Sequence, residues 1–250
     1  MNNTNQTTHF GFKTVDWHEK EAKVTQVFHS VANNYDLMND LMSFTLHRYW
    51  KQYTIALSYI RSGNIVLDLA GGSGDLTKLI SKKVSTEGLV FLTDINQAMI
   101  AVGRDRLLDN GYNNNIHFVR ANAQALPFAN NYFNCITIGF GLRNITDKDQ
   151  ALEAMYQACK PGGQIIVLEF SSPTSAILKT LYDWYSFNIL PKLGKIYAND
   201  SESYKYLVES IRMHPTQEEL KIMIENHGFE DCYYRNLCGG IVAVHIAHKY

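Results

Sequence analysis

Residues 66–76 read Val66-Leu67-Asp68-Leu69-Ala70-Gly71-Gly72-Ser73-Gly74-Asp75-Leu76, an apolar run that breaks into three glycines within four positions. Apolar residues at helical spacing follow, at Leu76, Leu79 and Ile80. The pattern predicts a buried strand, a tight turn and the N-terminus of a helix. Because glycine has no Cβ, a ligand can approach the backbone of such a turn closely.

An acidic residue stands where a ligand above this turn needs a partner. Asp94 follows Gly74 by 20 residues and comes directly after a second apolar run and its final threonine, Leu89-Val90-Phe91-Leu92-Thr93. A carboxylate at the tip of the second strand can accept hydrogen bonds from both hydroxyls of a ribose. The two features predict a nucleoside cofactor above the carboxyl ends of the strands. The alternative, a tight turn without a ligand, leaves the position of Asp94 unexplained.

The glycine pattern differs from that of a dinucleotide-binding fold. The segment Gly72-Ser73-Gly74-Asp75-Leu76-Thr77 ends in Thr77, where that motif has its third glycine. Asp75 also places a negative charge where a pyrophosphate would bind. S-adenosylmethionine (SAM) carries no phosphate, and Asp68 can attract its ammonium directly or through water. The residues therefore favour SAM, with an NAD(P)-dependent oxidoreductase as the alternative.

The composition is that of a single globular domain. The chain has 250 residues, 46% of them hydrophobic, and a net charge of −1, so no basic excess indicates nucleic acid as a partner. Its four cysteines show no Cys-x-x-Cys spacing and are predicted to be reduced and packed, and the histidines suggest no metal site. No apolar run approaches the ~20 residues that span a bilayer. We expect a cytoplasmic protein.

Strand-like and helix-like segments alternate along the middle of the chain. The expected strands are 64–69, 89–93, 116–120, 132–138 and 164–170, which predicts a parallel, doubly wound sheet. Helices are expected at 17–33 and 46–61 before this region and over 173–211 after it. Two final strands, 229–237 and 240–248, meet at Cys238-Gly239-Gly240, which is typical of a hairpin.

Four further segments carry a more specific resemblance. The chain resembles the UbiE-type C-methyltransferases of ubiquinone and menaquinone biosynthesis over essentially its whole length. The resembling segments are Thr8-His9-Phe10-Gly11-Phe12; Tyr35-Asp36-Leu37-Met38-Asn39 with Ser43, His47 and Trp50; Gly139-Phe140-Gly141-Leu142-Arg143-Asn144; and Leu168-Glu169-Phe170-Ser171.

The resemblance implies a Rossmann-like class I SAM-dependent methyltransferase of the α/β class. Its seven-stranded, mostly parallel sheet would be closed by an antiparallel C-terminal hairpin, with helices on both faces. We expect one domain, 1–250. Its parts are a helical cap at 1–61, the cofactor-binding core at 62–170, a helical substrate- or membrane-facing insertion at 171–215, and a C-terminal helix and hairpin at 216–250.

The resemblance also assigns cofactor-binding residues. It implies contacts to SAM from Ser73, Asp94, Asn122 and Ala123, to which the glycine turn adds Asp68 and Gly71. Gly139 belongs to this set by position, although many members carry serine there, so a polar contact is either missing or made by backbone. Asn122 can donate and accept at an adenine edge, with a turn-forming role as its alternative.

The implied reaction is methylation of a ring carbon in a polyprenylated benzoquinol, a demethylmenaquinol or both. Arg143 and Asn144 follow the fourth strand and are the predicted catalytic residues, because they can stabilise a developing phenolate and orient the ring hydroxyl. Asp147 could serve as the base or simply open a helix. His47 could close over the substrate or simply pack. A methyltransferase of another small molecule and a non-catalytic subunit are the remaining alternatives.

The partners follow from the implied substrate, whose isoprenoid tail lies in the bilayer. Residues 178–197 mix aromatic and aliphatic residues with lysines, as interfacial helices do. This segment either docks peripherally at the inner membrane or covers the substrate cavity. A homo-oligomer or a quinone-biosynthesis complex is also open.

Overall fold

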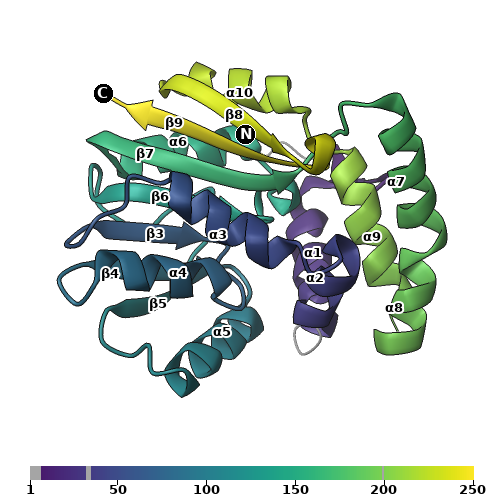
Figure 1. Cartoon of the computed structure of the whole chain (residues 1–250), viewed down its shortest axis with the longest axis horizontal. Helices are drawn as coiled ribbons and strands as arrows, with labels where there is room; N and C mark the ends of the chain where they lie inside the picture. The colour runs from purple at the N-terminus through teal and green to yellow at the C-terminus, as the bar shows by residue number, and fades with distance from the viewer. Residues whose placement is uncertain (1–6, 32–34, 199) are drawn as a thin grey trace.

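The computed structural model describes residues 7–31, 35–198 and 200–250. Its centre is a seven-stranded sheet in the order β5-β4-β3-β6-β7-β9-β8, in which β5 to β7 are parallel and β9 runs antiparallel between β7 and β8 (Figure 1). This arrangement confirms the predicted fold class. The strands are β3 (Ile65–Leu69), β4 (Leu89–Asp94), β5 (Ile116–Arg120), β6 (Phe133–Gly139), β7 (Cys159–Phe170), β8 (Glu230–Leu237) and β9 (Val242–Lys249).

Helices cover both faces of the sheet because successive strand residues point to opposite sides. In β3, Val66 joins one apolar cluster while Leu67 and Leu69 join the other. The first cluster packs against α3 (His47–Leu57), α4 (Asp75–Val84) and α5 (Gln97–Asp109), and the second against α6 (Lys148–Ala158) and α10 (Gln217–Asn226).

The remaining elements lie beyond the arrowhead of β3 in Figure 1, at the end of the sheet where a cofactor is expected. They come from both ends of the chain. The N-terminal part supplies the hairpin of β1 (Thr7–Phe10) and β2 (Lys13–Asp16), then α1 (Trp17–Val31) and α2 (Tyr35–Ser43). The predicted helical segment 173–211 forms α7 (Ala176–Asn188), α8 (Leu190–Ala198) and α9 (Ser201–Arg212).

Local sequence signals mark several element boundaries. Thr216 and Glu219 form a capping box at the start of α10, and Gly228, with φ +88°, follows its end. The predicted start of the fifth strand at 164 is wrong, because β7 already pairs with β6 at Cys159 through an irregular register. The predicted turn at residues 238–240 is a short 3₁₀ segment, with Gly239 at φ +65° and Gly240 at φ +90°.

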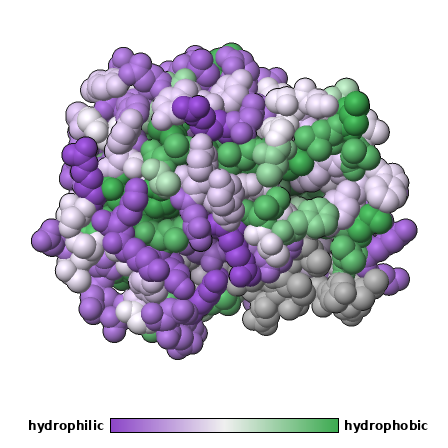
Figure 2. All heavy atoms as spheres, viewed as in Figure 1, coloured by the Kyte–Doolittle hydropathy of each residue, from purple (hydrophilic) through white to green (hydrophobic). Residues whose placement is uncertain are grey.

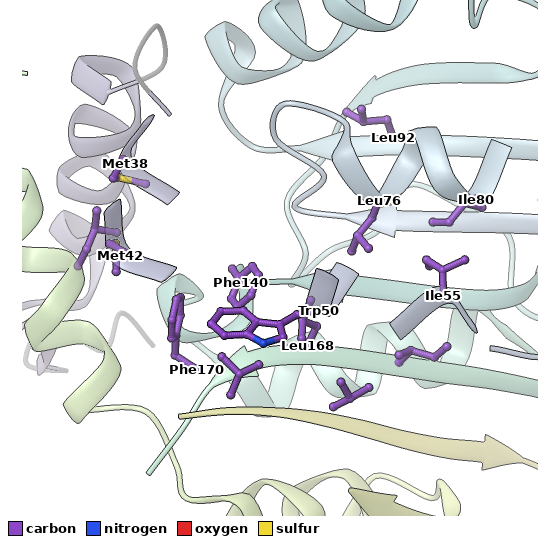
Figure 3. Close-up of a cluster of buried hydrophobic side chains, with 14 of the residues drawn as sticks. Met38, Met42, Trp50, Ile55, Leu76, Ile80, Leu92, Phe140, Leu168 and Phe170 are labelled. Carbon is purple, nitrogen blue, oxygen red and sulfur yellow. The ribbon is translucent and has the colours of Figure 1, made fainter. Parts of the chain in front are cut away.

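The resembling segment at residues 35–50, here called the N-terminal signature, contains Trp50, which anchors α3 to the site end of the sheet. Trp50 is 2% exposed, and its ring lies edge-on to Phe170 at 6.2 Å and tilted against Phe140 at 6.3 Å between ring centroids (Figure 3). Such aromatic contacts add to the stabilisation from buried apolar area. Trp50 therefore fixes Phe140, the residue that follows β6.

The histidine of the same signature joins α2 to α3. His47 is 2% exposed, its Nε2 lies 2.8 Å from Asp40 Oδ1, and its backbone N–H donates to Ser43 Oγ. Burial lowers the pKa of His47 below its usual value, opposed by the hydrogen bond with Asp40. Of the two roles considered for His47, these contacts account for packing at the α2–α3 corner.

No helix in the described part of the chain is long and apolar enough to cross a membrane.

Candidate active site

A cavity lies above the carboxyl ends of β3, β4 and β6 and beneath α1. Together with its open mouth it holds about 790 Å³ of space not filled by protein atoms. The lining residues are Glu21, Val24, Thr25, Phe28, Leu69, Ala70, Gly72, Asp94, Ile95, Asn96, Met99, Ala121, Asn122, Ala123, Gln124, Phe140, Gly141, Asn144, Ile145 and Thr146.

Asp94 is held rigidly at the edge of this cavity. Its Oδ2 accepts from the backbone N–H of Gly72 at 3.1 Å and its Oδ1 from that of Asn96 at 2.8 Å. Burial raises the pKa of Asp94 to about 6, and the backbone donors work in the opposite direction. At neutral pH the carboxylate is ionised and can accept hydrogen bonds from a ribose diol, as the sequence predicts.

Only one glycine of the turn reaches the cavity. Gly72 lines it at φ +53°. Gly71 and Ser73, both predicted to contact the cofactor, do not line it, and Ser73 is 4% exposed. A Cβ on Gly71 would lie 2.9 Å from Leu92 Cγ and 3.1 Å from Asp68 Oδ2. Gly71 is therefore required for packing, while the approach to the backbone occurs at Gly72.

Asp68 is enclosed within the sheet and does not face the cavity. Its side chain is fully buried, and its two oxygens accept from Thr77 Oγ1 at 2.6 Å and Thr137 Oγ1 at 3.0 Å. Burial raises its pKa to about 6 against these two hydrogen bonds. The predicted direct attraction to an ammonium is thus absent from this geometry, because Asp68 instead ties β3 to α4 and β6.

The predicted adenine-side residues do reach the cavity, and α1 covers them. Asn122 and Ala123 both line it. Asn122 Nδ2 donates to Glu21 Oε2 at 3.3 Å, and Asn96 Nδ2 donates to the Thr25 carbonyl at 3.1 Å. These two amides hold α1 as a roof above the carboxyl ends of β4 and β5.

The segment after β6 divides the two predicted catalytic residues. Asn144 lines the cavity, whereas Arg143 does not. Arg143 Nη1 donates to Glu169 Oε1 at 2.7 Å and to the Phe140 carbonyl at 2.6 Å, and both charged side chains are almost fully buried. In the described conformation Arg143 therefore fixes the loop that presents Asn144, and direct contact with a ligand is left to Asn144.

Gly139 also lies outside the lining, for a steric reason. A Cβ at Gly139 would lie 2.6 Å from Leu76 Cδ1, so the leucine methyl occupies the space that a serine side chain needs. No contact of Gly139 to a cofactor follows from the structure. Gly141, which the sequence analysis did not single out, lines the cavity instead and sits against the Cβ of Ala70.

Asp75 does not carry the uncompensated negative charge that its position in the sequence suggests. Asp75 is paired with Lys51 at 2.6 Å and Arg106 at 2.9 Å, so its charge is compensated and does not by itself repel a pyrophosphate. The cavity supplies a different reason. None of the described residues that line it is Lys or Arg, while Glu21 and Asp94 are acidic. Such a site suits a cationic ligand better than a phosphorylated one.

Helix α1 contributes to the cavity, which was not predicted from the sequence. Glu21, Val24, Thr25 and Phe28 follow the spacing i, i+3, i+4, i+7 and face it. The apolar spacing of Val24 and Phe28 can be read from the sequence. It does not tell whether this helix face lines a ligand cavity or packs in a core, because both require apolar side chains.

Three remaining predictions concern Asp147, the cysteines and metal binding. Asp147 accepts from the backbone N–H of Gln150 at 2.9 Å and is the N-cap of α6, which accounts for its position without a role as base. Cys238 is exposed, against expectation, whereas the other three cysteines are buried. Within residues 7–31, 35–198 and 200–250, no three His, Cys, Asp or Glu residues form a metal-binding group.

Comparison with known proteins now decides the family. A sequence model of the ubiE/COQ5 methyltransferase family matches residues 16–249. The chain belongs to this family. A ubiquinone/menaquinone biosynthesis C-methyltransferase UbiE of Legionella pneumophila (strain Lens) is 68% identical over the full length of both chains. One of the same name from Yersinia enterocolitica is 58% identical over 98% of each.

A solved structure confirms the fold independently of close sequence similarity. The SAM-dependent methyltransferase from Aquifex aeolicus is 13% identical, with a TM-score of 0.57 over 94% of this chain and 100% of that one. Family and fold together confirm the predicted enzyme class, a methyltransferase with SAM as methyl donor. The cavity fits this cofactor, since it offers an ionised acceptor at Asp94, the side-chain amide of Asn122, and apolar walls.

Proposed function

We propose that this enzyme methylates a ring carbon of a polyprenylated benzoquinol, a demethylmenaquinol or both, in respiratory quinone biosynthesis. The full-length similarity to enzymes named for this reaction supports the proposal. The single structural observation behind it is that Asp94, at the end of β4, and Asn144, after β6, line one cavity on the two sides of β3. One can hold the nucleoside while the other faces the ring.

Within this proposal, Asp94 accepts from the ribose, and Asn122 and Ala123 contact the adenine edge. SAM, when bound, supplies a methyl group that its sulfonium makes electrophilic. Phe140 and Ile145 exclude water beside Asn144. The Asn144 side-chain amide donates to the ring oxygen whose negative charge activates the adjacent carbon. Arg143 positions Asn144 through its ion pair with Glu169 and does not touch the ring in the described conformation.

A site whose described lining has no Lys or Arg suits this reaction. The ring hydroxyl loses its proton to water, the ring carbon bonds to the methyl group as the methyl–sulfur bond breaks, and the hydrogen on that carbon then leaves as a proton that returns to the ring oxygen. A cationic donor and an anion-like ring thus become neutral products, so charge decreases on the way to the transition state. A strong counter-charge would stabilise the reactants more than the transition state. One neutral amide at Asn144, surrounded by apolar side chains, stabilises the phenolate without holding it tightly.

Ring methylation is tested with purified protein, labelled SAM and each reduced demethylquinol separately. Mass spectrometry of the product locates the methyl group on a ring carbon or on oxygen. We expect ring-carbon methylation, and loss of at least about 100-fold in kcat with Asn144→Ala while S-adenosylhomocysteine still binds. Quinone profiles of a strain lacking the gene provide the in vivo check. Normal quinone methylation in that strain and inactivity on both quinols would refute the proposal.

We further propose that α7 docks this enzyme on the bilayer that holds the substrate tail. Ile177, Leu181 and Trp184 lie on one helix face at 75%, 61% and 59% exposure. Figure 2 shows hydrophobic residues gathered at the end of the molecule where Figure 1 draws α7. The apolar face begins one residue before the predicted segment 178–197, and Leu190 within that segment is buried.

Flotation with vesicles of phosphatidylethanolamine and phosphatidylglycerol tests this docking. Leu181→Glu should abolish binding, while Tyr59→Glu, at a 62% exposed position in the connection after α3, should not. Absence of wild-type binding, or equal binding of both variants, would refute the proposal. If Leu181→Glu instead converts a dimer to a monomer in size-exclusion chromatography, the α7 face is an interface between copies of this chain.

A further inference from the structure

A tyrosine outside the cavity bonds directly to the residue placed against the ring. Tyr206 of α9 is 4% exposed, and its hydroxyl donates to Asn144 Oδ1 at 3.0 Å. The two residues are 62 positions apart, so only the packing of α9 against the segment after β6 brings them together. Burial raises the pKa of Tyr206, so the hydroxyl keeps its proton and acts as a donor.

We infer that Tyr206 is a positioning residue, whose hydroxyl fixes the Asn144 amide with its N–H group toward the substrate ring. This inference rests on the proposed function. The amide of asparagine has a donor end and an acceptor end, and only the donor end stabilises a phenolate. Because Tyr206 occupies Oδ1, the amide nitrogen of Asn144 is left for the cavity. Without the hydroxyl, the amide can rotate and present its oxygen to the ring oxygen, where the two would repel.

The N-terminal hairpin holds Tyr206 in place. The rings of Phe10 and Tyr206 stack with centroids 4.1 Å apart and an interplanar angle of 17°. One turn further along α9, Glu209 Oε2 accepts from the backbone N–H of Phe12 at 3.1 Å. Gly11 lies between these two contacts at φ +59°, and a Cβ there would collide with the Glu209 carboxylate. Through these contacts the segment Thr8–Phe12 holds α9, and with it Tyr206, in place. Neither Tyr206 nor Glu209 lines the cavity, so the segment acts on the site indirectly.

Tyr206→Phe tests the role of the hydroxyl, because it removes only that group and keeps the ring stacked on Phe10. We expect kcat to fall about tenfold, the order of one net hydrogen bond, with unchanged affinity for S-adenosylhomocysteine. Tyr204→Phe is the matched control. Tyr204 lies on the same helix, is 1% exposed, and its hydroxyl has no hydrogen-bond partner among the described residues, so kcat should not change.

A double mutant separates positioning from a general structural effect. If Tyr206 acts through Asn144, adding Tyr206→Phe to Asn144→Ala should produce no further loss of kcat. Gly11→Ala should also lower kcat, because its Cβ would push against Glu209 of α9 while Tyr206 and Asn144 stay unsubstituted. Additive losses in the double mutant, or wild-type kcat in Tyr206→Phe, would overturn the inference. Full activity of Asn144→Ala would instead overturn the proposed role of Asn144 itself.

Discussion

Replacing Asp94 by asparagine should weaken nucleoside binding by a calculable amount. The carboxylate can accept from both ribose hydroxyls, whereas an amide offers one acceptor oxygen in nearly the same volume. Loss of one charge-assisted hydrogen bond costs about 1.5–3 kcal/mol, which corresponds to about 10- to 150-fold in Kd. The amide also meets the backbone N–H groups of Gly72 and Asn96, one of which would then face an NH₂ group.

The pH dependence of binding shows how much of the affinity comes from the negative charge of Asp94, because protonation removes the charge and leaves the shape of the side chain almost unchanged. Because its pKa in the free protein is about 6, protonation should remove the acceptor below that pH. Wild-type affinity for S-adenosylhomocysteine should therefore be about tenfold weaker at pH 5 than at pH 8. Asp94→Asn should bind weakly and almost independently of pH over this range.

Isothermal titration calorimetry at pH 5, 6, 7 and 8 measures both effects. The same series with 5′-methylthioadenosine, which lacks the amino-acid group, removes the contribution of that part of the ligand. A wild-type affinity that does not change between pH 5 and 8, or a variant that binds as tightly as wild type at pH 8, would refute the reasoning about Asp94.

Three further predictions concern stability. Burial raises the pKa of Asp68 from 3.8 to about 6, so its contribution to stability is complete below pH 3.8 and is lost as the pH rises through 6. The Tm of the wild type should therefore fall between pH 4 and pH 8, and Asp68→Asn should make this fall smaller. Gly74→Ala should destabilise the fold in urea by more than Gly111→Ala, because both glycines have φ near +81° but only Gly74 lacks room for a Cβ; equal losses would contradict this. Trp50→Ala should lower the free energy of unfolding by about 3–5 kcal/mol, with the exposed Tyr59→Ala as control, and a loss under about 1 kcal/mol would refute its anchoring role.

The sheet and the edge where the site lies could be predicted because their signals are local. The apolar run of β3, the glycines after it and Asp94 at the end of β4 lie within 30 residues of one another. Parallel strands bring their carboxyl ends to the same edge of a sheet, so the spacing alone placed the acid beside the turn. Asn96 and Thr216 likewise cap helices through bonds to residues two or three positions away.

The pairing of charged and polar groups could not be predicted in the same way. Arg143 meets Glu169 across two strands, and Asp75 is neutralised by Lys51 and Arg106 from two different helices. A residue's position at the end of a strand does not tell whether its side chain turns toward a ligand or back into the protein. Arg143 and Asn144 are neighbours in sequence, yet only Asn144 reaches the cavity.

The sheet order has a consequence for how the chain folds during translation. Phe170 at the end of β7 pairs with Val242 of β9, 72 positions later, and β9 also carries β8 on its other side. At about 5–20 residues per second, the ribosome needs about 4–14 s to supply that partner. Throughout this interval the apolar edge of β7 has open hydrogen-bonding groups, which invite pairing with other nascent chains. Slower synthesis at low temperature lengthens this interval. A lower growth temperature alone should therefore raise overproduction yields less than added holdase chaperones do.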